Sequence, residues 1–377
     1  MLYLYSIEDG QMKILFVITS LGIGGAERQV LDLADRFSVR GHQIQIAYLT
    51  GPARLMPKNP NIKVVPIDIS KSPFRFARGY LRLRRLISDF KPDVVHSHMV
   101  HGNLLARVVR LTTKIPKLIC TAHSTNEGGW PRMFAYRLTD SLADIFTNVS
   151  KEAVEVFEAK GAAPHGRMLV IYNGIDTQKF SPDSAERESF RNKFAVGSDK
   201  IILAVGRLSK QKDYPNLVNA FKNISRKAEN IRLWIIGDGP LRESLESLVA
   251  ELGLIERVMF LGTLHDNDIP NFMRAADVFV LSSAWEGFGL VVAEAMATEK
   301  VVVATNSGGV KEVVGNCGFL VPPQNSEALA YALEKALCMP PERAKILGEK
   351  ARQRIIEKFS LDSAVDRWLE IYLAPGM

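Results

Sequence analysis

The stretch that decides the fold is Ser283-Ala-Trp-Glu-Gly-Phe-Gly-Leu-Val-Val-Ala-Glu-Ala-Met296. The apolar run at 276–281 is typical of a buried strand, and residues 290–297 follow a helical pattern. The Gly-Phe-Gly turn between them therefore joins a strand to a helix. We expect Glu286 on the loop above the strand, and Glu294 about one turn inside the helix.

This arrangement of two glutamates at a helix start indicates a particular class of ligand. A helix N-terminus offers free backbone N–H groups and the positive end of the helix dipole, and both attract phosphate. Carboxylates repel phosphate, but they accept hydrogen bonds from hydroxyl groups. A ligand with phosphate and several hydroxyls, such as a nucleotide sugar, satisfies both requirements.

The rest of the chain repeats the same alternation of strand, turn and helix. Strands are expected at 13–20, 42–49, 62–67, 92–98, 117–124, 144–148 and 168–172, and again at 201–205, 231–236, 258–261, 276–281, 301–304 and 318–322. Two such arrays predict an α/β fold of two doubly wound, Rossmann-like domains that face each other across a deep cleft.

The expected domain boundaries follow from changes in composition. A polar, charge-rich segment at 177–199 favours a boundary near residue 180. We expect a tail at 1–11, a first domain at 12–180, a second domain at 181–358, and a C-terminal helix at 359–377 that packs back toward the first domain.

Bulk composition indicates a soluble, cytoplasmic protein. Apolar residues make up 47% of the 377 residues and charged residues 24%, and no apolar run reaches the roughly 20 residues that cross a bilayer. The three cysteines show neither a disulfide framework nor metal-binding spacing. The net charge of +7 is concentrated within 74–90, where arginines alternate with apolar residues: Arg75, Arg78, Arg82, Arg84 and Arg85. This pattern fits a basic amphipathic helix on an anionic bilayer or a solvated surface helix, and no motif supports nucleic-acid binding.

Several polar residues and glycines follow the ends of predicted strands, where α/β sheets bind ligands. Gly24 and Gly25 make a tight turn or let a ligand approach the backbone. His123 ends one strand, and Arg207 and Lys212 follow another, either as phosphate ligands or as solvated surface charges. Three histidines gather near a further strand end: His96, His98 and His101. Because no carboxylate or cysteine lies at ligand spacing, polar lining of a cleft is favoured over a metal site.

Together these motifs resemble the retaining family-4 glycosyltransferases of the GT-B fold. The resemblance spans 12–372 and is carried by Gly24-Gly-Ala-Glu-Arg28, Thr121-Ala-His123, Asn173-Gly-Ile-Asp176, Gly206-Arg-Leu208, Gly237-Asp-Gly-Pro240 and Glu286-Gly-Phe-Gly-Leu290 with Glu294. The Gly-Gly-Ala-Glu-Arg and His-Ser-His motifs are most similar to those of bacterial members that build O-antigen (lipopolysaccharide), capsule or exopolysaccharide.

The resemblance implies roles for individual residues. Arg207 and Lys212 would stabilise the departing diphosphate, and Glu294 would hold the ribose hydroxyls. The catalytic residues implied are His123, Arg207, Lys212 and Glu286. The donor-binding residues implied are Gly24, Gly25, Gly206, Gly237, Phe288, Gly289, Leu290 and Glu294.

The reaction implied is the retaining transfer of a hexose or N-acetylhexosamine to a lipid-linked oligosaccharide. The donor would be a nucleotide diphosphate sugar, with UDP expected and GDP as the alternative, and neither metal nor cofactor is expected. The basic helix, with Arg75, Arg78 and Arg82, would dock the enzyme on the inner leaflet of the plasma membrane. The alternatives are a GT-B enzyme with a soluble acceptor, of the sucrose- or glycogen-synthase type, a nucleotide-sugar epimerase, and a non-catalytic scaffold that binds sugar nucleotides. The sequence leaves the oligomeric state open.

Overall fold

The structure is a computed structural model that describes residues 10–70, 72–265 and 267–374, so most of the expected tail at 1–11 lies outside the described residues. The described chain divides into two compact units. Unit 1 comprises 10–149, 154–171 and 365–374, and unit 2 comprises 150–153 and 172–364. The chain therefore passes between units at residues 171 and 172, earlier than the expected boundary near 180, and the last helix begins in unit 2 and ends in unit 1.

Unit 1 contains a seven-stranded sheet in which all neighbouring strands are parallel. The strand order is β3 (Lys63–Pro66), β2 (Gln43–Tyr48), β1 (Lys13–Ile18), β4 (Val94–His98), β5 (Lys117–Ala122), β6 (Ile145–Asn148), β7 (Met168–Val170). The helices are α1 (Gly25–Val39), α2 (Pro73–Phe90), α3 (Met99–Arg110), α4 (Trp130–Leu138) and α5 (Lys151–Ala159), whose first residues belong to unit 2.

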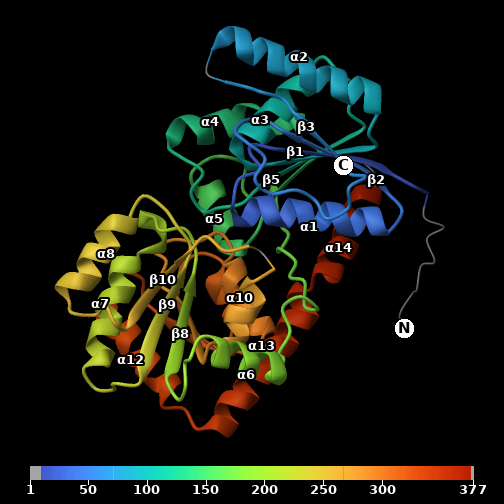
Figure 1. The fold of residues 1–377 in the computed structure, drawn as a ribbon. Helices are drawn as coiled ribbons and strands as arrows, with labels where there is room; N and C mark the ends of the chain where they lie inside the picture. The colour runs from blue at the N-terminus through green and yellow to red at the C-terminus, as the bar shows by residue number, and fades with distance from the viewer. Residues whose placement is uncertain (1–9, 71, 266, 375–377) are drawn as a thin grey trace. The chain divides into compact units, whose positions relative to one another are not determined.

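Helices cover both faces of this sheet, which explains why its central strands β1, β4 and β5 are almost continuously buried. Leu15 and Val17 of β1 point to the core shared with α2 and α3. Phe16, between them, points to the opposite face and contacts the ring of Phe37 on α1. Figure 1 shows α3 and α1 on opposite sides of the strands.

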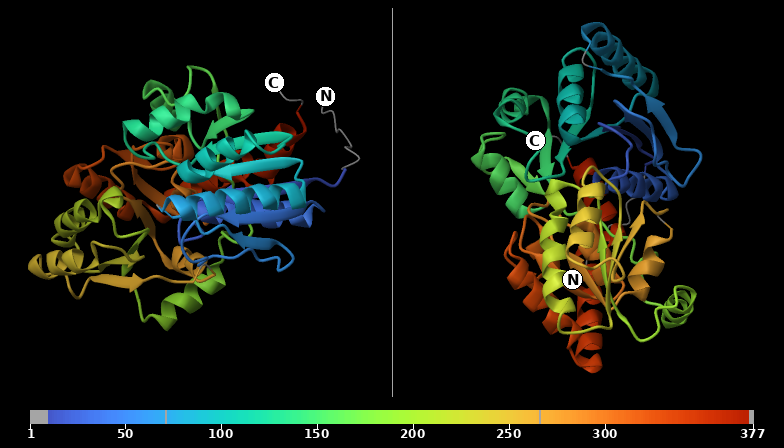
Figure 2. Two further views of the ribbon diagram at one scale, coloured as in Figure 1. Left: turned by 90° about the horizontal axis from the view of Figure 1, so that it is seen from above. Right: turned by 60° about the vertical axis from the view of Figure 1, so that its left-hand side comes forward.

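Unit 2 contains a six-stranded parallel sheet. The strand order is β10 (Val258–Gly262), β9 (Ile231–Ile236), β8 (Lys200–Val205), β11 (Val278–Leu281), β12 (Val301–Thr305), β13 (Phe319–Val321). The helices are α6 (Ser184–Lys193), α7 (Tyr214–Ser225), α8 (Arg242–Glu251), α9 (Ile269–Ala275), α10 (Leu290–Ala297), α11 (Val310–Val314), α12 (Ser326–Leu337) and α13 (Pro341–Phe359). Only the first residues of α14 (Leu361–Leu373) belong to this unit. Figure 2 shows the ribbon from two further directions.

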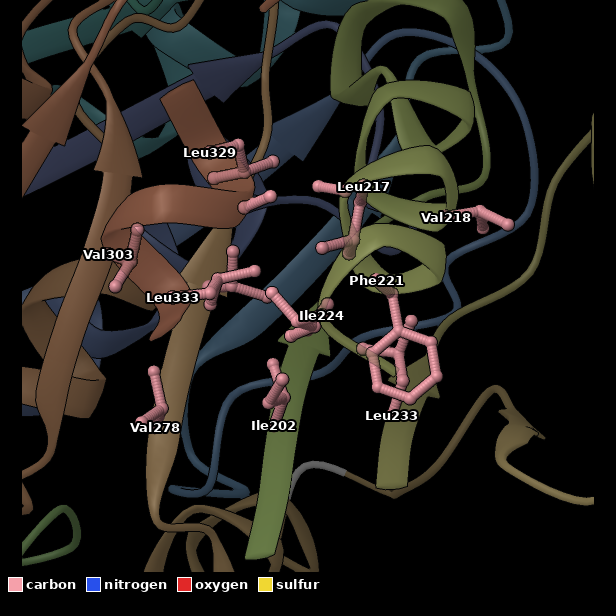
Figure 3. Close-up of a cluster of buried hydrophobic side chains, with 14 of the residues drawn as sticks. Ile202, Leu217, Val218, Phe221, Ile224, Leu233, Val278, Val303, Leu329 and Leu333 are labelled. Carbon is pink, nitrogen blue, oxygen red and sulfur yellow. The ribbon is translucent and has the colours of Figure 1, made fainter. Parts of the chain in front are cut away.

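The core of unit 2 lies between its sheet and helices α7 and α12. Leu217 and Phe221 of α7 meet Leu329 and Leu333 of α12 above the strand residues, as Figure 3 shows. All four leucine and phenylalanine side chains are fully buried. Burial of each contributes on the order of 1.5–3 kcal/mol to folding, so this layer fixes the strand ends that carry the site.

Both sheets reverse their strand order at a single point. The reversal falls between β1 and β4 in unit 1, and between β8 and β11 in unit 2. In open parallel sheets, ligands bind beyond the carboxyl ends of the strands at such a point, because the two connecting loops leave in opposite directions. The two alternating arrays predicted from the sequence are thus confirmed, and each contains one candidate binding position.

Helix α6 lies within the polar, charge-rich segment 177–199, where the sequence predicted a domain boundary and no helix. None of its residues is buried, so no apolar pattern announces it. Long-range contacts hold it: the guanidinium groups of Arg187 and Arg191 both bind the carboxylate of Asp277, at 2.8 and 3.2 Å. The ring of Phe190 also packs edge-on against that of Phe272 on α9, at a centroid distance of 4.8 Å. Asp183 caps its N-terminus by accepting a hydrogen bond from the backbone N–H of Glu186.

Among the described residues, no helix is both long enough and apolar enough to cross a bilayer.

Candidate functional site

The loops after β8 and β11 bring Lys212 and Glu286 together at the reversal point of unit 2. The ammonium group of Lys212 contacts one carboxylate oxygen of Glu286. The hydroxyl of Ser283 donates a hydrogen bond to that same oxygen at 2.7 Å. Glu286 is only 7% exposed and Ser283 is fully buried. The charge of Glu286 is thus held in place by a cation and a hydroxyl, as a buried carboxylate requires.

Backbone contacts hold these two loops against each other. The N–H of Ala284 donates to the carbonyl oxygen of Gln211 at 2.8 Å. The Gln211 side-chain amide donates to the carbonyl oxygen of Trp285 at 3.1 Å. The hydroxyl of Ser282 donates to the carbonyl oxygen of Lys212 at 2.8 Å. These hydrogen bonds hold the backbone on which Lys212 and Glu286 stand, so the pair is preorganised to bind a ligand in a defined geometry.

Glycines allow the loops after β8 and β9 to cross closely. Gly206 and Gly237 have φ angles of 157° and 134°, and a Cβ atom on Gly237 would overlap the Gly206 carbonyl oxygen. Gly237 thus lets its backbone pack against that of Gly206, whereas a Cβ atom on Gly206 would meet the side chains of Lys212 and Tyr214. Arg207, which follows Gly206, is exposed, and its guanidinium has no ion-pair or hydrogen-bond partner among the described residues. It is available to an anionic ligand.

Helix α10 places the remaining predicted residues of unit 2. Gly289 is its N-cap, with φ 87°, and Leu290 is its first residue. No side chain caps this N-terminus, which is therefore open to a ligand oxygen. Glu294 lies four residues after Leu290 and is 3% exposed. Phe288 is buried, with its ring against those of two other residues of unit 2, Tyr172 and Phe359.

The turn after β12 supports the Glu286 loop. Gly308 has φ 58°, and a Cβ atom on it would overlap the carbonyl oxygen of Glu286. Its N–H donates to a carboxylate oxygen of Glu152 at 3.0 Å, and the N–H of Gly309 donates to Gly287 at 3.2 Å. The close approach at this glycine pair is to the protein's own backbone.

In unit 1, His123 follows β5 and is bound on two sides. Its Nε2 lies 2.9 Å from Nδ1 of His98 at the end of β4, and its backbone N–H donates to Glu127 at 3.0 Å. Its Nδ1 is buried and has no hydrogen-bond partner among the described residues. Burial lowers the pKa of His123 to about 4, so the ring is neutral at pH 7.

A chain of buried polar groups behind His123 was not predicted from the sequence. The hydroxyl of Tyr136 donates to Glu127 at 2.7 Å and accepts from the Asn103 amide at 3.1 Å. Burial raises the pKa of Glu127. Only its position four residues after His123 could have suggested a role, since the tyrosine and the asparagine come from α4 and α3.

The three histidines expected near β4 do not gather at one place. His96 and His98 are buried, whereas His101 on α3 is exposed. His96 bonds the hydroxyls of Tyr372 and Thr121, each at 2.7 Å. Within the described parts of the chain, no three His, Cys, Asp or Glu side chains are placed to hold a metal ion.

The turn before α1 is occupied by the protein's own carboxylate. Gly24 is the N-cap of α1 and Gly25 its first residue. Glu27, in the first turn, is 8% exposed and accepts a hydrogen bond from Ser20 at 3.1 Å. A Cβ atom on Gly24 would lie 2.5 Å from the Glu27 carboxylate. This glycine therefore makes room for Glu27, and Gly25 remains a candidate for ligand approach.

The three arginines predicted to meet a membrane differ in their surroundings. Arg75 and Arg78 on α2 are exposed. Arg82 instead forms an ion pair with Asp68 and donates to the carbonyl oxygen of Ile67 at 3.3 Å. Arg82 therefore supports the α2 packing and is a poor candidate for binding a surface.

Acidification from pH 7 to 5 is expected to lower the free energy of unfolding. Burial lowers the pKa of His123 to about 4, and those of His96 and His98 well below the ordinary value. Between about pH 6.5 and 4 the unfolded chain therefore binds more protons than the folded protein, and stability falls as pH falls. His123 alone should contribute about 2 kcal/mol between pH 6.5 and 5.

Thermal unfolding monitored by circular dichroism between pH 5 and 8 measures this slope. His123→Asn should flatten it, whereas His265→Asn, at an exposed histidine, should flatten it less. If the unfolding temperature depends on pH in the same way in the wild type and in His123→Asn, His123 does not contribute to the loss of stability on acidification.

Comparisons with known proteins agree with this architecture. Residues 186–354 match the family described as glycosyl transferases group 1, and residues 23–179 match glycosyltransferase family 4. The chain is 30% identical to the putative glycosyltransferase EpsD of Bacillus subtilis (strain 168), with 82% of this chain and 84% of EpsD covered. It is 26% identical to the UDP-Gal:alpha-D-GlcNAc-diphosphoundecaprenol alpha-1,3-galactosyltransferase of Escherichia coli, over 78% of this chain and 79% of that protein.

Among solved structures, Anabaena HepE in complex with UDP and glucose superposes with a TM-score of 0.86. The match covers 97% of this chain and 100% of HepE at 22% identity, so it speaks to the fold alone. The prediction of a GT-B architecture with two Rossmann-like domains is thereby confirmed.

Proposed function

The chain belongs to the group 1 glycosyl transferases, and on this premise we propose that it transfers a hexose or N-acetylhexosamine from a nucleotide diphosphate sugar to a lipid-linked oligosaccharide. The observation that carries the donor half of this proposal is the Lys212–Glu286 pair beside the open N-terminus of α10. These groups lie at the reversal point of the unit 2 sheet, where both phosphate and hydroxyl groups of a ligand find partners.

In the proposed donor complex, the ion pair exchanges partners. The Lys212 ammonium and the exposed Arg207 guanidinium bind the diphosphate, and the α10 N-terminus adds its dipole. Glu286, released from Lys212, accepts hydrogen bonds from hydroxyls of the sugar, while Glu294 holds the ribose hydroxyls. As the sugar departs, negative charge grows on the diphosphate and strengthens its attraction to both cations.

We propose that the configuration at the anomeric carbon is retained and that no metal ion takes part. The two cations would supply the positive charge that the leaving diphosphate needs. The acceptor would attack from the face that the diphosphate leaves, and a phosphate oxygen would take the acceptor proton. No carboxylate nucleophile is then required, in contrast to retaining glycosidases. His123 would hydrogen-bond the donor sugar near the reacting carbon.

UDP is proposed as the nucleotide, with GDP as the alternative. HepE was crystallised with UDP, and the Escherichia coli relative is named for a UDP-galactose donor. A panel of UDP- and GDP-sugars, screened by thermal shift and by slow donor hydrolysis in EDTA, tests this proposal. One donor should raise the unfolding temperature and be hydrolysed, since a ligand that binds only the folded state stabilises it. Binding without turnover, even with acceptors supplied, would favour the non-catalytic scaffold.

A lipid-linked acceptor is proposed partly because the Escherichia coli relative is named for a diphosphoundecaprenol-linked one. The surface of unit 1 adds independent support. Helices α2, α3 and α4 are neighbours on one face of its sheet (Figure 1). They expose large apolar side chains at Phe74, Phe76, Leu81, Val108, Trp130, Phe134 and Leu138.

The apolar face of α4 is the most regular part of this surface. Trp130, Phe134 and Leu138 follow one another at intervals of four and are 71%, 45% and 67% exposed. The rings of Trp130 and Phe134 stack at a centroid distance of 5.2 Å. Residues four apart lie on one side of a helix, so α4 presents an apolar ridge. Helices α4 and α2 also carry exposed arginines: Arg75, Arg78, Arg84, Arg85, Arg132 and Arg137. Aromatic and basic groups together suit an anionic lipid surface.

Binding to anionic vesicles is expected to depend on both parts of this surface. Arg75→Gln with Arg78→Gln should weaken binding by about 20- to 30-fold, because each surface arginine contributes about 1 kcal/mol. Trp130→Ser with Phe134→Ser should weaken it by at least as much. Sedimentation with phosphatidylglycerol vesicles measures this, and Ile346→Ser on α13, half exposed at 50%, is the matched control.

Equal sedimentation of all these variants would refute the docking surface. Transfer to a soluble acceptor with no gain from lipid linkage would favour the sucrose- or glycogen-synthase type of reaction instead.

A further inference from the structure

A cavity of about 330 Å³ lies in unit 2 at the amino ends of strands β8, β11 and β12. The first residues of these strands line it: Lys200, Val278 and Val301. Lys300, which immediately precedes β12, lines it as well and is partly buried. The candidate donor site lies beyond the opposite ends of these strands, so the proposed transfer leaves this lysine unused.

Cations outnumber carboxylates around Lys300. Three of them share the carboxylate of Asp277: Arg187 at 2.8 Å, Arg191 at 3.2 Å and Lys200 at 3.9 Å. The guanidinium of Arg187 and the ammonium of Lys300 both donate to the carbonyl oxygen of Arg274, at 2.6 and 3.0 Å, so these two cationic groups are neighbours. Among the described residues, Lys300 forms no ion pair of its own. Its positive charge is therefore in excess at this place.

Lys300 consequently favours its neutral amine form. Burial, together with the guanidinium groups of Arg187 and Arg191, lowers the pKa of Lys300 to about 7, and the carboxylates of Asp277 and Glu299 offset this effect only in part. The neutral amine carries a lone pair. A lysine that is desolvated or adjoins other cationic groups is for that reason an activated nucleophile.

The charges that line the cavity also favour one kind of electrophile. Acylation would produce a neutral amide, which gains nothing from the surrounding cations. CO₂ instead converts the amine into a carbamate, whose two oxygens share a negative charge and accept hydrogen bonds from guanidinium and ammonium groups. CO₂ is also small and uncharged, so its entry into a partly buried space requires no ion to be desolvated.

We propose that Lys300 is a carbamylation site that reacts reversibly with CO₂. The Nζ lone pair forms a bond to the carbon of CO₂, one C–O π bond opens onto oxygen, and Nζ releases a proton to water. The product is an anionic carbamate, and no atom is oxidised or reduced. This anion lies next to Arg187 of α6 and joins that helix to the start of β12. The inference is independent of the proposed glycosyl transfer.

Chemical trapping tests the site directly. The whole chain at pH 7.5, with or without dissolved CO₂, is treated with triethyloxonium, which converts a carbamate into a stable ethyl ester, and tryptic mass spectrometry locates the modified lysine. We expect modification of Lys300 that requires CO₂ and exceeds that of Lys345 by at least about tenfold, because an exposed lysine is almost wholly protonated at this pH. Lys345 lines the same cavity but is exposed. No CO₂-dependent product on Lys300, or equal product on both lysines, would overturn the proposal.

Two variants test whether the cations promote the reaction. Lys200→Met removes a cation that shares Asp277, and the yield of carbamate on Lys300 should fall by about threefold, the usual size of one partly exposed charge interaction. Lys210→Met, at an exposed lysine beyond the opposite end of β8, is the matched control and should keep the wild-type yield. If Lys200→Met also gives the wild-type yield, the surrounding cations do not promote carbamylation and the proposal fails.

Thermal unfolding provides a second readout. CO₂ at constant pH and ionic strength should raise the unfolding temperature of the wild type, because a reaction confined to the folded protein stabilises it by mass action. Lys300→Met, which lacks the amine, should show no such rise, and an equal rise in both proteins would contradict the proposal. If Lys300→Met does not fold, the comparison of Lys300 with Lys345 in the wild type still decides. None of these measurements requires a nucleotide sugar, so a failure of the proposed function would leave them unaffected.

Discussion

Lys212→Ala is expected to lower the turnover of the nucleotide sugar by about 10²- to 10³-fold. Loss of one preorganised group that faces developing charge in a transition state typically costs this much. Lys212 contacts Glu286 in the free protein and is proposed to move to the diphosphate when the donor binds. The effect should therefore appear mainly in kcat, with a smaller change in KM, because the charge on the diphosphate is greatest as it leaves.

The matched control is Lys210→Ala. Lys210 lies on the same 3-10 turn (Lys210–Lys212) and is exposed. The kcat of Lys210→Ala should stay within about twofold of the wild-type value, because surface substitutions usually have small effects. Removing Lys212 also takes the cation from a buried carboxylate, which can cost about 3–5 kcal/mol of stability. Rates must therefore be compared below the unfolding temperature of each variant. Equal rates for Lys212→Ala and Lys210→Ala would contradict the assigned role.

Gly308→Ala is expected to lower the stability of the protein strongly. The residue has φ 58°, and its Cβ atom would overlap the carbonyl oxygen of Glu286. A left-handed alanine costs about 1–2 kcal/mol, and overpacking against fixed backbone adds about 1–3 kcal/mol. The unfolding temperature should fall by at least about 4 °C, given about 2–4 °C per kcal/mol in a domain of this size. Because Glu286 must move, donor turnover should also fall.

Gly253→Ala separates strain from collision. Gly253 has φ 67°, close to that of Gly308, but a Cβ atom there would meet nothing within 4 Å. It should cost only the left-handed strain and leave turnover unchanged. Thermal unfolding and donor hydrolysis of the two variants make the comparison. If both lose the same stability and Gly308→Ala keeps wild-type turnover, the turn after β12 does not support the Glu286 loop.

The parts of the fold that local pattern determines were predictable from sequence. Helix α10 begins and ends where its apolar pattern predicted, at residues 290 and 297. The preceding strand β11 is four residues long and fully buried, and the turn after it marks its end. In such segments the residue propensities, the apolar periodicity and the turn residues all predict the same element.

The parts that long-range contacts determine were not predictable. Helix α6 has no buried side chain and depends on partners far along the chain, the Asp277 carboxylate and the Phe272 ring. Helix α3 follows β4 without a loop, because Met99 adopts φ 65°, a conformation rare for a non-glycine residue. No turn residue marks its start, and it was missed.

The candidate site divides in the same way. Glu286, Glu294, Arg207 and Lys212 were singled out as candidates because they adjoin a recognisable turn or strand end. Nothing in the sequence indicated that Lys212 pairs with Glu286. The bond between His98 and His123 depends on the register of β4 and β5, in which His98 lies opposite Thr121. Side-chain partners across strands follow from that register, which local sequence does not specify.

The central claim is that the loops after β8 and β11, with the start of α10, bind a nucleotide sugar. Calorimetric titration of UDP and GDP into the wild type and Glu294→Gln tests it most directly. Glu294 is 3% exposed, and glutamine keeps its size while removing the charge that would hold two ribose hydroxyls. The account predicts that one nucleotide binds the wild type and that Glu294→Gln, still folded, binds it at least tenfold more weakly. Equal affinity in both proteins, or no binding by the wild type, would contradict it.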